Sequence, residues 1–282
     1  MSRTVLVLTA TGTTGSATVR ALADRGVNVR AATRDPARAD FPAGVTAVAW
    51  SYDDPATWGP ALAGVDALYL AVPPFRADEA EVGVAIVDAA RAAGVRRIVK
   101  LSAAGVENNP ESGHRRIELA IEGSGLEWIH LRPSFFAENF AESYGAGIKN
   151  DGAIYLPAGK GKSGFVTAAD IGEVAAVALL GDGTGEAWTL TGPESLDHDE
   201  VAEIFTRELG RPVRFVDVPP DAFAATLRSH GADEVTVGAL GALYGFVRAG
   251  WTGGLTDDVE RALGRKPRSL AEWVRAHASA WT

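Results

Sequence analysis

A glycine-rich segment near the start of the chain has the residue types and spacing that hold phosphates. Thr9, Gly12 and Gly15 occupy a G-x-x-G-x-x-G spacing in which threonine replaces the first glycine. An apolar run precedes the segment and a helical pattern follows it. This is the context a dinucleotide loop requires, because the helix N-terminus offers amide groups to a pyrophosphate, whereas an isolated glycine triplet is often only a turn. We expect cofactor contacts from Thr11, Gly12, Thr13, Thr14 and Gly15.

Arg34 indicates which dinucleotide the loop would hold. An NAD site usually places an acid at the end of the second strand, where it bonds the ribose 2′-hydroxyl. Here Thr33 and Arg34 stand at that point. A guanidinium suits a 2′-phosphate because of its charge and its forked donors, so the pattern favours NADPH over NADH. The alternative is a solvated Arg34 that pairs with Asp35.

Candidates for proton transfer are few. The Tyr-x-x-x-Lys pair that many dehydrogenases use to protonate a carbonyl oxygen is absent, since no tyrosine has a lysine four residues on. His114 and Glu118 are four residues apart and share a helix face. His114 could donate a proton, or it could be a polar residue at the start of a surface helix. Ser102, directly after a predicted strand, is either a cofactor or substrate contact or a turn former.

The composition excludes several other chemistries. The chain has no cysteine, which removes disulfides, thiolate nucleophiles and sulfur-ligated metals, and its five histidines never occur at metal-ligand spacing. We therefore expect no metal. Lys and Arg number 27 against 36 Asp and Glu, and the formal net charge of -9 argues against nucleic acid or anionic membrane as a partner. A small-molecule partner fits better. Gly161-Lys162-Ser163 lacks the first glycine of a P-loop and is interpreted as a flexible basic loop.

The elements that must position these residues alternate between short β-branched runs and alanine-rich helical segments. This rhythm predicts an α/β fold, a Rossmann-type doubly wound parallel sheet covered by helices. One covering helix is expected over 77–93, ending at Gly94, and capping boxes are expected at Thr167 with Asp170 and at Asp197 with Glu200. The six predicted strands are Thr4 to Leu8, Asn28 to Thr33, Thr46 to Ala49, Ala67 to Ala71, Arg97 to Leu101 and Glu127 to Leu131.

The alternation loosens after about residue 150, which suggests a division of the 282 residues. We expect an NADP-binding domain over 1–150, remaining sheet and helix elements of the core over 151–194, and a smaller, mostly helical substrate or lid subdomain over 195–282. The last part includes a predicted strand over 213–216 and a turn at Pro219-Pro220. No segment is apolar for the eighteen or so residues of a membrane helix. We expect a soluble, cytoplasmic protein whose oligomeric state the sequence leaves open.

Longer segments of the chain resemble the NmrA-like atypical short-chain dehydrogenases. The likeness is carried by TATGTTG, TRDP, LAVPP, GVRRIVKLSA, SGLEWIHLRPSFFAENF and GKGKSGFVTAADIGEVA. Within that group, AVPP, LRPSFFAEN, LTGPESL and GRKPRSLAEWV look most like the fungal festuclavine and agroclavine dehydrogenases of ergot alkaloid pathways and their bacterial relatives. The resemblance implies a reductase, and it departs from the isoflavone-reductase branch, whose catalytic lysine on the helix after the fifth strand is not evident here.

The resemblance also implies roles for individual residues. Arg34 would contact the 2′-phosphate, Ala71, Val72 and Pro73 would form the adenosine-side wall, and Ser102 with Pro133 to Phe136 would lie on the nicotinamide side. Candidate substrate contacts are Phe75, Phe136, Asn139 and Trp251. The aromatic residues among them could equally be core or lid packing.

The activity that we expect from these observations is hydride transfer from NADPH to an iminium or another electron-poor conjugated small molecule, such as one of secondary metabolism. An iminium becomes a neutral amine on receiving hydride, so it needs no strong general acid and tolerates the missing Tyr-x-x-x-Lys pair. Two alternatives stay open at this point. One is an NADPH:quinone reductase, and the other is a dinucleotide-sensing regulatory protein that binds the cofactor without turnover.

Overall fold

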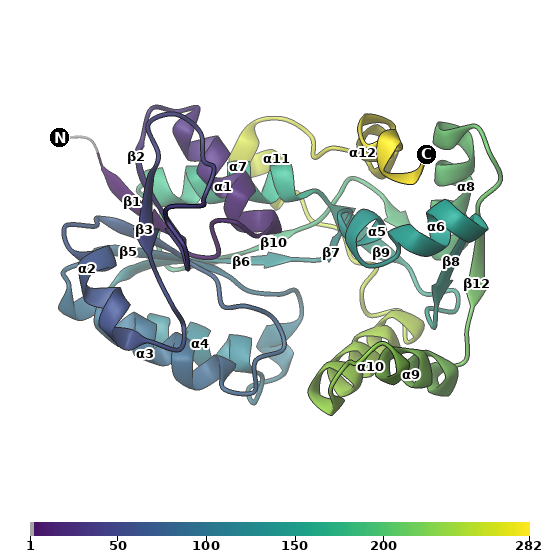
Figure 1. The fold of residues 1–282 in the computed structure, drawn as a ribbon, viewed down its shortest axis with the longest axis horizontal. Coiled ribbons are helices and arrows are strands. Elements are labelled where there is room, and N and C mark those ends of the chain that lie inside the picture. The colour runs from purple at the N-terminus through teal and green to yellow at the C-terminus, as the bar shows by residue number, and fades with distance from the viewer. Residues whose placement is uncertain (1–2) are drawn as a thin grey trace. The chain divides into compact units, whose positions relative to one another are not determined.

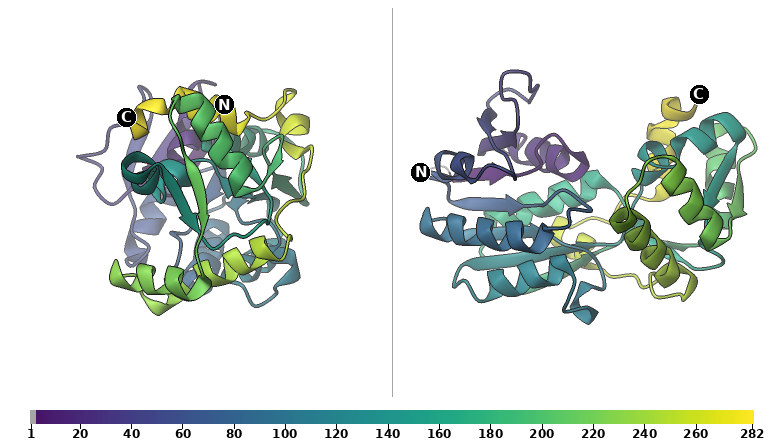
Figure 2. Two further views of the ribbon diagram at one scale, coloured as in Figure 1. Left: turned by 90° about the vertical axis from the view of Figure 1, so that its right-hand side faces the viewer. Right: turned by 60° about the horizontal axis from the view of Figure 1, so that its bottom comes forward.

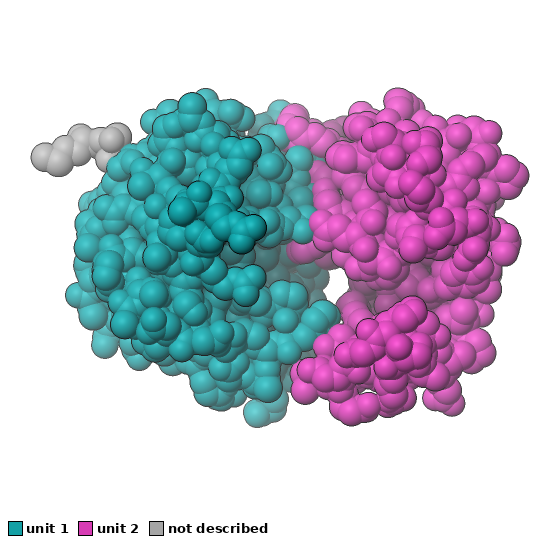
Figure 3. Space-filling model, viewed as in Figure 1, with its two compact units in different colours: residues 1–133, 168–190, 258–264 teal, residues 134–167, 191–257, 265–282 magenta. Residues whose placement is uncertain are grey.

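The computed structural model describes residues 3–282, which pack into two compact units (Figure 3). The first unit comprises the chain up to Pro133 together with Ala168–Leu190 and Asp258–Gly264. The second comprises Ser134–Thr167, Thr191–Asp257 and Arg265–Thr282. Each unit is thus built from three segments. The boundaries expected at residues 150 and 194 do not coincide with the points where the chain passes from one unit to the other.

The first unit contains a seven-stranded, all-parallel sheet in the order β10-β6-β5-β4-β1-β2-β3. The order reverses beside β1, as expected for a doubly wound sheet. The six predicted strands are present, and the seventh, β10, was not predicted because an edge strand with a charged start lacks the apolar run of a buried one. The strands are β1 (Thr4–Val7), β2 (Asn28–Thr33), β3 (Thr46–Ala49), β4 (Ala67–Leu70), β5 (Arg97–Leu101), β6 (Glu127–Pro133) and β10 (Glu186–Leu190).

Helices cover both faces of this sheet (Figures 1 and 2). One face carries α1 (Thr13–Ala23), α7 (Ala168–Leu180) and α11 (Asp258–Leu263). The other carries α2 (Trp58–Leu62), α3 (Glu79–Ala92) and α4 (Gly113–Glu122), with short 3-10 turns at Pro55–Thr57 and Val106–Asn108. The helix expected over 77–93 is confirmed as α3, and Gly94 follows it with a φ of +82°, the left-handed conformation that glycine adopts most readily.

The second unit is mostly helical around an aromatic core that includes Phe140, Phe165, Phe205, Tyr244 and Trp281. Its strands form a three-stranded sheet in the order β11-β9-β7 and a parallel pair, β12 with β8. The strands are β7 (Phe135–Phe136), β8 (Ala153–Leu156), β9 (Ser163–Val166), β11 (Ser195–Leu196) and β12 (Arg214–Asp217). The helices are α5 (Asn139–Glu142), α6 (Gly145–Asp151), α8 (His198–Leu209), α9 (Pro220–Ser229), α10 (Glu234–Arg248) and α12 (Leu270–Ala276), with a final 3-10 turn at Ala278–Trp281.

In the second half of the chain the structure confirms a predicted helix cap but not a predicted turn. The capping box at Asp197 and Glu200 is confirmed: the Asp197 side chain accepts from the Glu200 amide, and the Glu200 side chain accepts from the Asp197 amide. The turn expected at Pro219-Pro220 is wrong, because Pro220 is the first residue of α9, where its missing N–H costs nothing. Among residues 3–282, no helix is long and apolar enough to cross a membrane.

The predicted basic loop at Gly161-Lys162-Ser163 contacts α8 and α10. Lys162 Nζ lies 2.9 Å from Glu200 Oε2, and a β-carbon on Gly161 would lie 1.8 Å from the Val247 carbonyl oxygen. The structure places Ser163 at the start of β9, and the flexibility expected of this loop stays a prediction.

Candidate cofactor and active site

The loop between β1 and α1 is shaped by backbone approaches that only glycine permits. A β-carbon on Gly15 would lie 2.0 Å from the Thr9 carbonyl oxygen, and one on Gly12 would lie 3.3 Å from the same atom. The Gly12 amide donates to that oxygen at 2.8 Å. Gly12 is the N-cap of α1 and supplies no side chain to cap it. The first amides of α1 therefore open toward the loop, which is the arrangement that binds pyrophosphates.

Thr9 stands where the spacing would place the first glycine, and its backbone has a conformation that glycine adopts more readily. Its φ is +48°, a left-handed conformation that costs a non-glycine residue about 1–2 kcal/mol. Tyr52 packs beside this turn: its hydroxyl donates to the Ala71 carbonyl at 2.6 Å and lies near the Thr9 backbone. Burial raises the pKa of Tyr52, so it remains a neutral donor. The strained loop and the end of β4 are thus tied to one side chain.

Arg34 follows β2 with an exposed side chain. Within residues 3–282 its guanidinium forms no hydrogen bond or ion pair with another side chain. Asp35 accepts a hydrogen bond from the Ala37 amide at 3.2 Å instead, so the alternative pairing of Arg34 with Asp35 does not form. The carboxyl ends of β1 and β2 meet at one edge of the parallel sheet, which places this unpaired cation at the same edge as the glycine loop.

Lys100 is buried in β5, with an exposed fraction of 1%. Its Nζ donates to the Leu101 carbonyl at 2.9 Å and lies 3.0 Å from His114 Nδ1, which in turn lies 3.0 Å from Glu79 Oε1. Burial lowers the pKa of Lys100 to about 8. Burial would raise the pKa of Glu79, but the His114 hydrogen bond and the His114 and Lys100 charges lower it. Lys100 of β5 and Glu79 of α3 therefore both contact the Nδ1 atom of His114 on α4.

Glu118, which shares a helix with His114, has other partners. Its fully buried carboxylate accepts from Arg132 at 3.0 and 2.8 Å and from Arg115 at 2.9 Å. Burial would raise its pKa, but the hydrogen bond from Arg132 holds the pKa at about 2. Ser102 is also buried, and its hydroxyl helps to lower the Glu118 pKa without forming a hydrogen bond of good geometry. Ser102 thus places a buried hydroxyl beside Glu118 directly after β5, and its contact with a cofactor or substrate stays a prediction.

One group of residues has the spacing of a metal site. Ligand atoms of Glu118, Glu122 and His130 lie within 4.8 Å of one another. However, Arg115 already donates to both carboxylates, at 2.9 and 2.6 Å, and Arg132 also donates to Glu118, so two arginines balance the two charges. Burial lowers the pKa of His130 to about 4, so it is a neutral imidazole packed flat against Trp128. We assign this group to the charge balance of the core, and the expectation of no metal stays a prediction.

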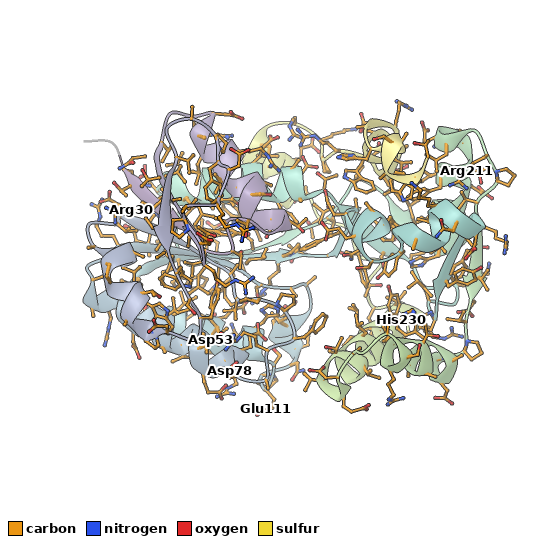
Figure 4. All side chains as sticks on the ribbon, in the orientation of Figure 1. Arg30, Asp53, Asp78, Glu111, Arg211 and His230 are labelled. Carbon is orange, nitrogen blue, oxygen red and sulfur yellow. The ribbon has the colours of Figure 1, made fainter. Side chains whose placement is uncertain are left out.

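The predicted wall after β4 is followed by a clamped turn. Ala71 is buried and Val72 and Pro73 are half-buried, and Phe75 has a left-handed φ of +62° and an exposed fraction of 45%. Arg76 binds Asp53 at 2.8 Å and Asp78 at 2.8 Å, and Figure 4 shows these two carboxylates close together. The clamp fixes the backbone that presents the Phe75 ring.

The remaining substrate and nicotinamide candidates lie at or after the end of β6. Pro133 is the last residue of β6 and of the first segment, Phe136 is half-buried in β7, and Asn139 begins α5. Trp251 is 74% exposed and stacks on Phe246, with ring centroids 5.5 Å apart. The latter three belong to the second unit. Their roles remain predictions.

Two residues of this region, Lys100 and Glu79, were not predicted from the sequence as candidate site residues. The available signal was a lysine inside RIVKL, a strand that is otherwise apolar and lies in the middle of a buried parallel sheet. A cation there must find polar partners. Those partners come from α3 and α4, which sequence spacing alone does not pair.

A model of the NmrA-like family matches residues 1–274. The chain belongs to the NmrA-like family. The resemblance drawn from its motifs is therefore confirmed. An NAD(P)H azoreductase of Xenophilus azovorans is 33% identical, covering 98% of this chain and 99% of that protein, and the agroclavine dehydrogenase of Claviceps fusiformis is 36% identical over 77% of this chain and 76% of that protein. A structure of an NADPH-dependent quinone oxidoreductase from Escherichia coli with NADPH has a TM-score of 0.85 and 26% identity, covering 98% and 99% of the two chains.

Proposed function

We propose that this NmrA-like chain is an NADPH-dependent reductase that delivers hydride to an iminium or another electron-poor conjugated small molecule. The observation that carries the proposal is the unpaired Arg34 beside a helix N-terminus lined by Gly12 and Gly15. Two similar proteins support it: the azoreductase whose name specifies NAD(P)H, and the NADPH-dependent quinone oxidoreductase solved in complex with NADPH. The relatives' different acceptors leave the substrate open.

The residues present fit such a cofactor. The amides at the start of α1 would hold the pyrophosphate, and Arg34 would bond the 2′-phosphate. Ala71, Val72 and Pro73 would line the adenosine side, while Ser102 and Pro133 would line the nicotinamide side. When bound, NADPH supplies the hydride. The protein orients the acceptor and excludes water around it.

The experiment is an assay of NADPH oxidation by purified protein across cyclic imines, quinones and enones, run beside a direct measurement of NADPH binding. We expect binding and turnover with at least one acceptor class. Binding without turnover on any of the three would contradict the reductase and favour a dinucleotide sensor. The absence of binding would contradict the cofactor site itself.

A further inference from the structure

The contact shared by Lys100, His114 and Glu79 can carry only one arrangement of protons at a time. His114 Nδ1 lies 3.0 Å from the Lys100 ammonium nitrogen and 3.0 Å from Glu79 Oε1. A single ring nitrogen either accepts from Lys100 or donates to Glu79. In the first arrangement His114 is neutral with its proton on Nε2. In the second, Nδ1 carries the proton and donates it to Glu79, so Lys100 cannot donate to the same nitrogen.

We propose that Lys100 is a positioning residue that keeps His114 in the Nε2–H form and passes a proton to Nδ1 as Nε2 protonates the reduced substrate. This inference rests on the proposed function and extends it to acceptors that need a proton. It assigns to the buried lysine a role that the missing Tyr-x-x-x-Lys pair would otherwise fill. His114 is then the catalytic acid.

The location of His114 fits this role. It is the second residue of α4, the helix that follows β5 and the Ser102 loop, and its side chain is 35% exposed while Lys100 is 1% exposed. The imidazole thus lies between the buried Lys100, which can supply a proton, and the carboxyl edge of the sheet, where doubly wound folds bind their ligands.

The charges around Lys100 make the transfer feasible. Glu79 from α3 and Glu118 from α4 favour its ammonium form, while burial and Arg132 from β6 oppose it. His130 of β6 is held neutral, and Glu118 is occupied by two arginines. Lys100 is therefore an ammonium that can lose its proton near neutral pH, and Glu79 can accept a hydrogen bond from the Nδ1–H that the transfer creates.

The proton balance distinguishes two acceptor classes. With an enone, hydride goes to the β-carbon and leaves an enolate oxygen. That oxygen takes the Nε2 proton while Nδ1 takes one from the Lys100 ammonium, and after product leaves Nδ1 returns its proton to the lysine amine and Nε2 regains one from solvent. With an iminium, hydride alone gives a neutral amine. A damaged relay should therefore slow the first reaction much more than the second.

The test compares Lys100→Met, which keeps the length of the side chain without its charge, with Lys149→Met as a matched control. Lys149 lies on α6 and donates to the Thr282 carbonyl. We expect Lys100→Met to lower kcat for enones and quinones by about a hundredfold, within the usual range for general acid catalysis. We expect a far smaller loss with cyclic iminium ions and none in the control. An equal loss with both acceptor classes, or no loss with either, would overturn the relay.

A second readout needs no turnover. In nitrogen-15 NMR of histidine-labelled protein, with His114 assigned by the His114→Gln variant, we expect the Nε2–H form in the natural chain. In Lys100→Met we expect the Nδ1–H form, bonded to Glu79. An unchanged tautomer would contradict the role of Lys100. If the natural chain binds NADPH but reduces nothing, the proposed function fails, while the tautomer still tests the contact.

Discussion

The glycine loop of β1–α1 and the ionic cluster of β5, β6 and α4 lie in the same unit but are built in opposite ways. The loop uses backbone atoms, with Gly15 against Thr9, and leaves the nearby Arg34 without a partner. The cluster uses side chains that satisfy one another, as Glu118 does with two arginines. An unsatisfied group is available to a ligand, whereas a saturated one maintains the core. We therefore expect cofactor contacts at the loop, whereas the ion pairs of Glu118 with the two arginines maintain the core.

The largest effect should come from breaking the cluster at Glu118. Glu118→Gln removes the charge that Arg132 and Arg115 share, so that Arg132 keeps only Glu107 and Arg115 only Glu122 as an acidic partner. We expect the free energy of unfolding to fall by about 3–5 kcal/mol, the usual result of breaking a buried ion pair. Urea unfolding would measure it. Glu81→Gln is the matched control, because Glu81 also pairs with an arginine but is 59% exposed, and it should change stability little. Equal effects would mean that burial of the pair does not matter.

A buried histidine in the cluster should make stability depend on pH. The His130 pKa of about 4 lies below its ordinary 6.5, so the unfolded chain binds more protons between these values. Stability is therefore retained above about pH 6.5 and lost as pH falls toward 4, by up to about 1.4 kcal/mol per pH unit. His198, buried in the second unit, has the same shift.

The histidine prediction is tested by unfolding at several pH values. His130→Phe and His198→Phe should each flatten the slope below about pH 6.5, and the double variant should flatten it most. A natural chain with no slope in this window would contradict the assignment of both histidines as buried neutral groups.

The loop should break at Gly15. A β-carbon there meets backbone atoms of Thr9, which cannot rotate away, so Gly15→Ala should cost about 1–3 kcal/mol and weaken NADPH binding. Gly238→Ala is the control, because the added β-carbon would meet no atom within 4 Å outside its own helix backbone and alanine favours the α10 helix. Thermal unfolding and fluorescence titration would report the two effects. A Gly15→Ala protein that binds NADPH normally would show that α1 does not hold the pyrophosphate.

The same contrast explains what the sequence could and could not predict. The strand–loop–helix order around Gly12 and the cation after β2 are local, so both were predicted from spacing. The fold followed from apolar runs and helix stops such as Gly94. The contact of Lys100 with Glu79 and His114 joins three elements and has no local signature. The edge strand β10 was not predicted either, because Glu186–Leu190 lacks the apolar run of a buried strand. The two units are each assembled from several segments that alternate along the chain, whereas the sequence suggested linear boundaries.

Arg34 tests the central claim most directly, because it separates NADPH from NADH at one phosphate. Its charge-assisted bonds to the 2′-phosphate should each contribute about 1.5–3 kcal/mol, so Arg34→Ala should weaken NADPH binding about tenfold or more. NADH binding should be nearly unchanged. The measurement is calorimetric titration of the natural chain and the variant with both cofactors. A large fall in the NADPH preference supports the account, and an identical NADPH to NADH affinity ratio in the two proteins would contradict it.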